Sequence, residues 1–416
     1  MKIVKYFFVS IISVFLTVLI LNQYAPILID VPKKDSLLID INFEKEIVKK
    51  ELSPVTTKAK NIILLIGDGM GSNQILSYRI AKGGPNFITA FDKFPVTGLV
   101  KTHAYNTIVT DSASSATAYS TGTKTINRYI GVDHEKKPVK NIAEILYQKG
   151  YVTGIIATSE ITHATPAAFA AHTDSRYNTD LIAEQIYTSN NYFIFGGGKN
   201  FFLTEEDGGL RQDGKNYLSY IKKNDFLLET KDELHGHNFQ KGKRIFGLFN
   251  NEELIREEHE PSLFEMFDFV LKNSNSMVNE GCTGFFIMAE GSQIDWKGHD
   301  NDFYGQYSEI EEFEYLVEKA LEFAKGREDT LLIVTADHET GGLLIEKEDL
   351  RYNETNQMKV SWNTAIAQGD HTGAMVPIFS YGPGSQNFSG VMDNTDIFFA
   401  MKEAIGIENL PDSFCY

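Results

Sequence analysis

The chain of 416 residues is long enough for one large α/β domain or two average domains, and its 42% hydrophobic residues can fill a sizeable core. Its net charge of −17 makes nucleic acid and anionic membrane surfaces poor partners, so an anionic substrate would need local positive charge, such as metal ions supply. The two cysteines, Cys282 and Cys415, do not have the spacing of a metal site. Two cysteines are too few for a disulfide framework, and they do not indicate the cellular compartment.

The N-terminus begins with Lys2 and Lys5 and continues with an uncharged apolar run from Tyr6 to Leu21. This pattern predicts that residues 1–25 form a cleaved export signal or an uncleaved membrane anchor, and both readings stay open because the run is followed by a poor cleavage site. Either one places the remaining chain outside the cytoplasm, in the periplasm or at the cell surface. Residues 26–58 are mixed and charged, and we expect them to form a tether.

Apolar runs of strand length alternate with helical patterns along the rest of the chain. The runs that we expect to form strands are residues 61–67, 152–158, 284–289, 330–336 and 375–382. Because they are apolar on both faces, they are typical of a parallel sheet that helices cover on each side. The sequence therefore predicts a doubly wound α/β domain with a mostly parallel central sheet. Two stretches of weaker pattern, 199–260 and 346–369, are expected to be peripheral insertions.

Three helices have clear start or stop signals. We expect residues 141–150 to form a helix that ends at Gly150, and capping boxes at Ser262/Glu265 and Ser308/Glu311 predict helices over 261–273 and 308–326. The glycine-rich stretch 195–202 could be mistaken for a phosphate loop. It lacks a following Ser or Thr and a helix start, so we interpret it as a turn.

Acidic and histidine side chains accompany the predicted strands, mostly where a strand ends. They are Asp68 after 61–67, His163 and Thr165 after 152–158, Glu290, Asp295 and His299 after 284–289, Asp337 and His338 after 330–336, and His371 just before 375–382. Ligands of open α/β sheets bind beyond the carboxyl ends of the strands. Clustered carboxylates raise each other's pKa unless cations lie among them, so we expect a cluster of divalent metals. Histidines with carboxylates suit zinc, whereas an oxygen set such as Asp68, Thr165 and Glu290 suits magnesium.

The stretch VTDSASSATAYSTG, residues 109–122, places Ser112 at the start of a helix of small residues. A helix N-terminus favours an anion, and a nearby zinc ion would lower the pKa of the serine hydroxyl and make it a nucleophile. We expect the small residues to keep this surface open to substrate. The alternative is that Ser112 or Asp111 simply caps the helix.

The chain resembles the alkaline phosphatases from about Lys60 to about Gly406. The resemblance rests on motifs that come in the family's order: IGDGMG (66–71), TDSASSATA (110–118), THATPAAFAAH (162–172) leading into Ser175-Arg176, AEGSQIDWKGH (289–299), TADHETGG (335–342) and HTG (371–373). It implies an alkaline phosphatase-like three-layer sandwich, a single catalytic domain over 59–408 and a homodimer. It also implies a phosphate monoester hydrolase with an alkaline pH optimum, two zinc ions, one magnesium ion and a phosphoserine intermediate, which releases inorganic phosphate.

The resemblance further implies a role for each site residue. Ser112 is expected to be the nucleophile, and Arg176 to hold phosphate oxygens with its guanidinium. The expected ligands are Asp295, His299 and His371 for one zinc ion, Asp68, Asp337, His338 and the Ser112 oxygen for the second, and Asp68, Thr165 and Glu290 for magnesium. His163 and Trp296 stand where the enterobacterial pattern has Asp and Lys, as in certain cold-adapted and marine members. We expect His163 to approach the magnesium through water and Trp296 to line the phosphate site.

Three other functions compete with this one. A sulfatase would need a Cys/Ser-x-Pro-x-Arg signature, which is absent around Ser112. A phosphodiesterase of the superfamily usually has a threonine nucleophile and lacks the Arg176 clamp. A non-catalytic phosphate-binding protein is expected to have lost Ser112 or a metal ligand. The sequence therefore favours small phosphate monoesters as substrates and predicts no nucleic acid recognition.

Overall fold

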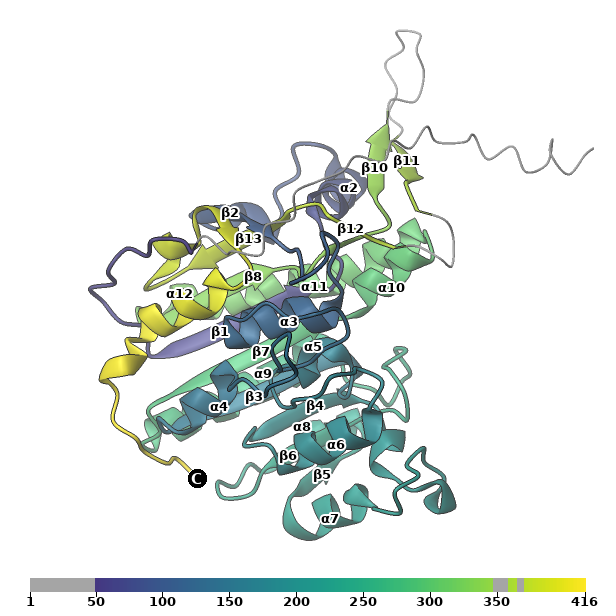
Figure 1. Ribbon diagram of the computed structural model, residues 1–416, viewed down its shortest axis with the longest axis vertical. Coiled ribbons are helices and arrows are strands. Elements are labelled where there is room, and N and C mark those ends of the chain that lie inside the picture. Colours follow the sequence, from purple (N-terminus) through teal and green to yellow (C-terminus); the bar gives the residue numbers. More distant parts are fainter. Residues whose placement is uncertain (1–48, 347–357, 365–369) are drawn as a thin grey trace, which may run out of the picture. The chain divides into compact units, whose positions relative to one another are not determined.

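Ten strands form the central sheet of the protein, which a computed structural model describes for residues 49–346, 358–364 and 370–416 (Figure 1). In spatial order they are β14 (Gly390–Asp393), β2 (Val96–Lys101), β13 (Val376–Tyr381), β8 (Thr330–Thr335), β1 (Asn61–Gly67), β7 (Gly284–Gly291), β3 (Tyr151–Glu160), β4 (Phe193–Gly197), β6 (Ile245–Leu248) and β5 (Phe226–Leu228). Neighbouring strands are parallel except at β13, which is antiparallel to both β2 and β8. The predicted mostly parallel α/β fold is confirmed.

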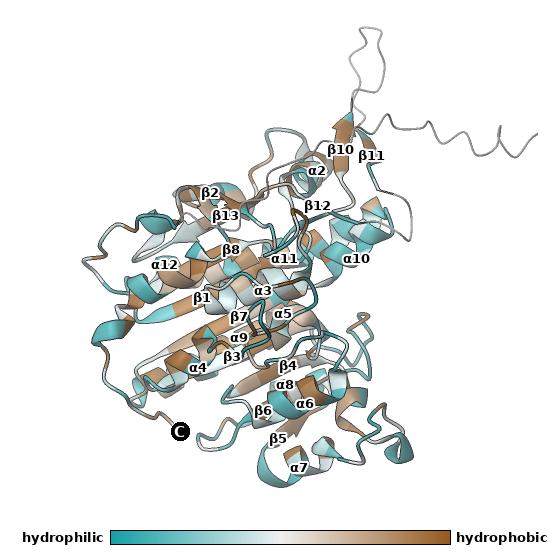
Figure 2. Cartoon of the chain, in the orientation of Figure 1, coloured by the Kyte–Doolittle hydropathy of each residue, from teal (hydrophilic) through white to brown (hydrophobic). Residues whose placement is uncertain are grey.

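The three strands at the centre of the sheet are buried along their whole length. Every residue of β1, β7 and β8 is buried, as expected for runs that are apolar on both faces. Figure 2 shows apolar residues along the central strands and hydrophilic residues on the outer loops. Burial of these strands accounts for much of the free energy of folding, because it removes a large apolar area from water.

Helices cover both faces of the sheet (Figure 1). α9 (Leu263–Asn279) packs on β3 and β7, and α11 (Phe303–Lys325) packs on β8, β1 and β7. On the other face, α4 (Ile142–Tyr147) and α5 (Ala164–Ala167) pack on β3, while α3 (Ser112–Thr121) lies between α5 and α12 (Asp396–Ile405). The outer helices are α2 (Ser72–Gly83), α6 (Thr179–Thr188), α7 (Tyr217–Asn224), α8 (Lys231–Gly236) and α10 (Gln293–His299), and 3-10 turns cover Ala90–Lys93, Lys199–Phe202, Glu205–Asp207, Ser385–Phe388 and Ile407–Asn409.

The predicted helix signals are confirmed except for one start: α11 has Gly326 as its C-cap, as expected, but it does not begin at Ser308. The Ser262/Glu265 capping box begins α9, and α4 ends three residues before Gly150, which has φ of +78°. The Ser308/Glu311 pair lies inside α11. That helix begins earlier, because Asp302 caps it by accepting a hydrogen bond from Gly305 N at 2.9 Å.

The reversed direction of β13 follows from the path of the chain. After β8 the chain stays at the same edge of the sheet, where it forms the short pairs β9 (Glu339–Thr340) with β12 (His371–Thr372) and β10 (Leu343–Glu346) with β11 (Lys359–Trp362). The described residues between β8 and β13 include no crossover helix, and β13 starts from the edge at which β8 ends. This reversal places His371, which precedes β13, beside the residues that follow the parallel strands.

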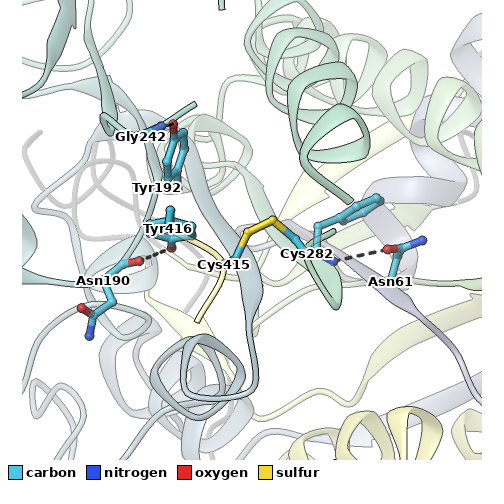
Figure 3. The surroundings of a disulfide bond; sticks show 8 residues. Asn61, Asn190, Tyr192, Gly242, Cys282, Cys415 and Tyr416 are labelled. Carbon is cyan, nitrogen blue, oxygen red and sulfur yellow. Dashed lines mark hydrogen bonds between the residues drawn. A yellow bond between two sulfur atoms is a disulfide. The ribbon is translucent and has the colours of Figure 1, made fainter. Parts of the chain in front are cut away.

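A disulfide bond ties the C-terminus to the body of the protein (Figure 3). Cys415 bonds to Cys282, which follows α9, so the two cysteines form one cross-link although they do not form a framework. Beside it, Tyr416 Oη donates a hydrogen bond to the Asn190 carbonyl at 2.6 Å, and its ring meets the Tyr192 ring edge-on at 4.6 Å. The last residues are therefore held by both covalent and packing contacts.

Some predicted segments lie partly or wholly outside the described residues. These are the export signal or anchor at 1–25, most of the tether at 26–58 and much of the insertion at 346–369. The end of the tether is described, and there Ser53 N donates to Asn387 Oδ1 at 2.8 Å. Within residues 199–260, β5 and β6 extend the edge of the sheet. In the described part of the chain, no helix has both the length and the apolar character needed to cross a membrane.

Candidate active site

Ser112 stands at the first position of α3. Asp111 is the N-cap, and its carboxylate accepts a hydrogen bond from Ser114 N at 3.0 Å. All ten residues of α3 are buried, so their small side chains serve close packing against α5 and α12, and the expectation of an open surface here is wrong. Ser112 itself still lines a cavity, where its Oγ lies 3.2 Å from His338 Nε2.

A first group of ligand side chains joins α10 to β12. Asp295 and His299 share one face of α10, which settles the i, i+4 spacing as helical, with His299 Nε2 3.2 Å from Asp295 Oδ2. His371 Nε2 lies 3.6 Å from Asp295 Oδ1. The Nδ1–H of His371 donates to the Thr110 carbonyl at 2.9 Å, so its Nε2 carries the lone pair that faces the group.

A second group follows β1 and β8. Asp68, Asp337 and His338 are fully buried, and His338 Nε2 lies 3.4 Å from Asp68 Oδ1 and 3.1 Å from Asp337 Oδ2. The ring of His338 stacks on that of His371, with centroids 3.5 Å apart. The first and second groups therefore adjoin, and Ser112 lies beside both.

A third group shares Asp68 with the second. Ligand atoms of Asp68, His163 and Glu290 lie within 4.8 Å of one another, as do those of each of the other two groups. Ser292 Oγ donates to Glu290 Oε2 at 2.7 Å, which orients that carboxylate. Thr165 is the second residue of α5, and His163 is the N-cap of that helix, so both belong to the same short turn after β3.

Arg176 is held in place on two sides. Its Nη1 lies 3.2 Å from Asp111 Oδ2, and its Nη2 donates to His163 Nε2 at 2.8 Å. Burial lowers the pKa of His163 to about 3, and the charge of Arg176 contributes to the drop, so the imidazole is neutral. The Trp296 ring packs edge-on against His163 with centroids 5.9 Å apart. The guanidinium is thus oriented before any anion binds.

Buried carboxylates dominate the electrostatics of the site. Burial raises the pKa of Asp68 well above its ordinary value, and three neighbouring carboxylates add to the rise. Burial also raises the pKa of Glu290 to about 7. Within the described residues, Asp68 Oδ2, Glu290 Oε1 and Thr165 Oγ1 are buried and have no hydrogen-bond partner. Each such atom costs about 1–3 kcal/mol, so bound cations would stabilise this arrangement.

The cavity that Ser112 lines measures about 380 Å³. His163, Arg176, Asp295, Trp296, His299 and His371 also line it, so the cavity joins the predicted phosphate residues to the first group of ligands. Asp68, Thr165, Glu290, Asp337 and His338 are not part of its lining. Residues that the sequence analysis missed complete the lining, namely Glu160, Thr162, Ala164, Tyr177, Thr179 and Phe201. The sequence offers little indication of these residues. Only Glu160, the last residue of β3, combines a metal-binding side chain with a position at the end of a strand.

A larger cavity of about 790 Å³ lies apart from these groups, between α9 and α11. Glutamates line it, but the described basic residues already neutralise part of that charge: Arg256 lies 3.1 Å from Glu312, and Lys82 lies 3.0 Å from Glu314. The buried Glu260 accepts hydrogen bonds from backbone N–H groups. Glu257, His259 and Glu260 form one further group of potential metal ligands here, but two of the three are exposed, and the nearby Ser262 hydroxyl is engaged with Glu265 in the capping box of α9. The smaller cavity, where Ser112 lies beside buried ligand groups, is therefore the candidate active site.

Comparison with known proteins shows the family to which the chain belongs. The family model for alkaline phosphatase matches residues 59–359 and 346–407. The chain is 35% identical to alkaline phosphatase 4 of Bacillus subtilis (strain 168), over 81% of this chain and 87% of that protein. It is 31% identical to the alkaline phosphatase of Escherichia coli (strain K12), over 84% of this chain and 87% of that one.

A solved structure agrees over a similar extent. The alkaline phosphatase of the Antarctic bacterium TAB5 superposes with a TM-score of 0.74 and 36% identity, over 84% of this chain and 99% of that one. Mutants of the TAB5 enzyme, in which a histidine is replaced by aspartate or glutamate, hold Mg in a site named M3. Because the family model and these relatives cover most of its length, the chain belongs to the alkaline phosphatase family and is a phosphatase that acts on phosphate monoesters.

Proposed function

We propose that the protein hydrolyses phosphate monoesters in two steps through a phosphoserine at Ser112, with two zinc ions and one magnesium ion. The observation that carries the proposal is the position of Ser112 Oγ. It lies at the N-terminus of α3, 3.2 Å from His338 Nε2, where three groups of potential metal ligands adjoin.

The donor atoms of the three groups fit these ions. Two groups combine imidazole with carboxylate, as zinc prefers: Asp295, His299 and His371, and Asp68, Asp337 and His338. Asp68, Thr165 and Glu290 supply only oxygen, as magnesium prefers. Bound ions would neutralise charge on the phosphoryl group and lower the pKa of the attacking hydroxyl groups.

The chain's own residues orient and attack the substrate. Arg176, held by Asp111 and His163, presents two N–H groups to phosphate oxygens, and the N-terminus of α3 adds the positive end of its dipole. Ser112 Oγ forms a bond to phosphorus as the bond from phosphorus to the alcohol oxygen breaks, and the alcohol leaves. Water then attacks the phosphoserine, which releases inorganic phosphate and restores the serine.

The test is a comparison of esters by the purified protein. It should hydrolyse p-nitrophenyl phosphate with an optimum above pH 8, faster than the bis-ester or a sulfate ester, and added zinc should restore activity after chelation. Faster turnover of the bis-ester or the sulfate ester would instead favour a phosphodiesterase or a sulfatase. Binding of phosphate without turnover would favour a non-catalytic protein.

We also propose that the protein is exported, acts in the periplasm or at the cell surface and forms a homodimer. The apolar N-terminal run supports export, and so does the Cys282–Cys415 disulfide, because disulfides persist in oxidising compartments. N-terminal sequencing of the mature protein distinguishes a cleaved signal, with a start near residue 26, from an uncleaved membrane tether. Sedimentation measures the oligomeric state.

A further inference from the structure

Part of the lining of the active-site cavity consists of residues that have no part in the proposed phosphoryl transfer. Glu160, Tyr177 and Phe201 line the same hollow as Ser112, Arg176 and Trp296. When the phosphoryl group of a monoester contacts Ser112 and Arg176, its alcohol must occupy the remainder of this cavity. Three aromatic rings and one carboxylate are therefore available to the leaving alcohol.

The glycine-rich stretch before Phe201 packs closely against Glu160. Glu160 ends β3 and pairs with Gly197 at the end of β4. The next residue, Gly198, has φ of +87°, and a Cβ there would lie 2.9 Å from Glu160 Cβ, so only glycine lets the two segments come this close. The 3-10 turn Lys199–Phe202 follows directly. This close approach holds Phe201 and Glu160 at one wall of the cavity.

The carboxylate of Glu160 is not engaged in an ion pair within the described part of the chain. Among the described residues no lysine, arginine or histidine forms an ion pair with it, and the guanidinium of Arg176 is engaged by Asp111 and His163. Burial raises the pKa of Glu160, and the charges of Glu252 and Glu253 add to the rise, whereas Arg176 lowers it. A half-buried carboxylate of this kind is stabilised by a cation that enters the cavity.

The aromatic rings suit the same kind of ligand. Tyr177 is 68% exposed, and the guanidinium carbon of Arg128 lies 5.6 Å from its ring centroid, so a cation already approaches one face of this ring. Trp296, whose ring stands edge-on to His163, offers a second surface on the same cavity. Aromatic rings that surround a site together with a carboxylate are the usual means of binding an ammonium group.

We propose that Glu160, with Tyr177, Phe201 and Trp296, forms a leaving-group pocket that selects monoesters of amino alcohols, in which the alcohol carries an ammonium group. This inference rests on the proposed function, because it assumes that the phosphoryl group is held at Ser112 and Arg176. The ammonium group lies against the aromatic rings and near the Glu160 carboxylate. Alcohols that carry a carboxylate or a second phosphate are disfavoured.

Two substrates that differ only in charge provide the test. Phosphocholine and 3,3-dimethylbutyl phosphate have the same shape, but the first has a quaternary nitrogen where the second has carbon. The measured quantity is the ratio of their kcat/KM values, since effects of a variant on the chemical step alone cancel in this ratio. Glu160→Gln should lower the ratio about tenfold, and Tyr177→Leu about threefold, while Tyr177→Phe keeps it.

Glu206→Gln is the matched control, because it removes an equal charge from an exposed position outside the cavity and should change neither the ratio nor the activity. An unchanged ratio in Glu160→Gln would overturn the inference. A wild-type kcat/KM that is higher for 3-phosphoglycerate than for phosphocholine would also overturn the inference. It would indicate that Arg128 attracts alcohols that carry a negative charge. If the wild type fails to hydrolyse even p-nitrophenyl phosphate, the proposed function is wrong. The inference is then tested by calorimetry, which compares the binding of phosphocholine and 3,3-dimethylbutyl phosphate to the wild type and to Glu160→Gln.

Discussion

Ser112 combines burial with access to substrate. Its side chain is 2% exposed, yet it lines the cavity from the first turn of α3, where backbone N–H groups are not yet paired within the helix. Such a position excludes bulk water from the hydroxyl and still admits a phosphate.

Replacing Ser112 by alanine should remove the phosphoenzyme and lower kcat about a thousandfold, because only direct attack by water would remain. Bound metal should stay near the wild-type content, since carboxylates and imidazoles supply most ligands. Ser120→Ala, at the far end of the same helix, is the control and should keep activity. Acid quenching and peptide mapping identify the labelled residue, and phosphate on any other side chain would contradict the role of Ser112.

The side chain at position 163 is expected to affect the affinity of the protein for magnesium. Its neutral imidazole adds no negative charge beside Asp68 and Glu290, whereas a carboxylate would. His163→Asp should therefore lower the half-activating magnesium concentration about tenfold, since affinity for hard cations rises with the charge of the ligands.

The measurement for His163 is a magnesium titration of activity at fixed zinc. The exposed His235→Asp substitution provides the control for the added charge. An unchanged or higher half-activating concentration in His163→Asp would leave His163 as a packing residue that positions Arg176.

At the scale of elements, helix starts show which local signals are decisive. Ser262 caps α9 in a complete capping box, whereas Ser308 has the same sequence signature inside α11. In α11 the start is decided by Asp302, which binds the first-turn N–H of Gly305. A sequence that contains two potential caps does not by itself indicate which one the chain will use.

Ser262→Ala should lower the free energy of unfolding by about 1 kcal/mol, because it leaves first-turn N–H groups of α9 without a partner. Ser308→Ala should be neutral or slightly stabilising, since alanine is the better helix former at an exposed interior position. Urea titrations of both variants measure the difference. Equal destabilisation by the two would refute the helix boundaries described here. Neither variant should alter activity.

At the scale of the molecule, the disulfide closes a long loop. Cys282 and Cys415 are 133 residues apart in sequence, and the cross-link holds Tyr416 near Tyr192 (Figure 3). In the chain-entropy model a loop of this length stabilises the folded state by about 4–5 kcal/mol.

Reduction should therefore lower Tm by several degrees and release the C-terminal residues, with little change in activity before unfolding, because the bond lies outside the active-site cavity. The Cys282→Ser/Cys415→Ser double variant should have the lower Tm with and without reductant. Scanning calorimetry checks both. A double variant as stable as the oxidised wild type would show that packing of Tyr416 suffices.

The sequence alone determined the features that depend on neighbouring residues. Runs apolar on both faces can be buried only within a covered sheet, so β1, β3, β7 and β8 were predictable, and so was the edge at which Asp68, Glu290 and Asp337 gather. The family motifs then named the candidate site residues, because each motif is a short continuous stretch.

Only the tertiary structure decided features that join distant segments. The antiparallel direction of β13, the closing of the Cys282–Cys415 bond and the pairing of Gly197 with Glu160 are of this kind. Each depends on which of several compatible partners a segment packs against. That choice is made by the free energy of the whole core, to which residues far apart in the chain contribute together, and no local pattern records it.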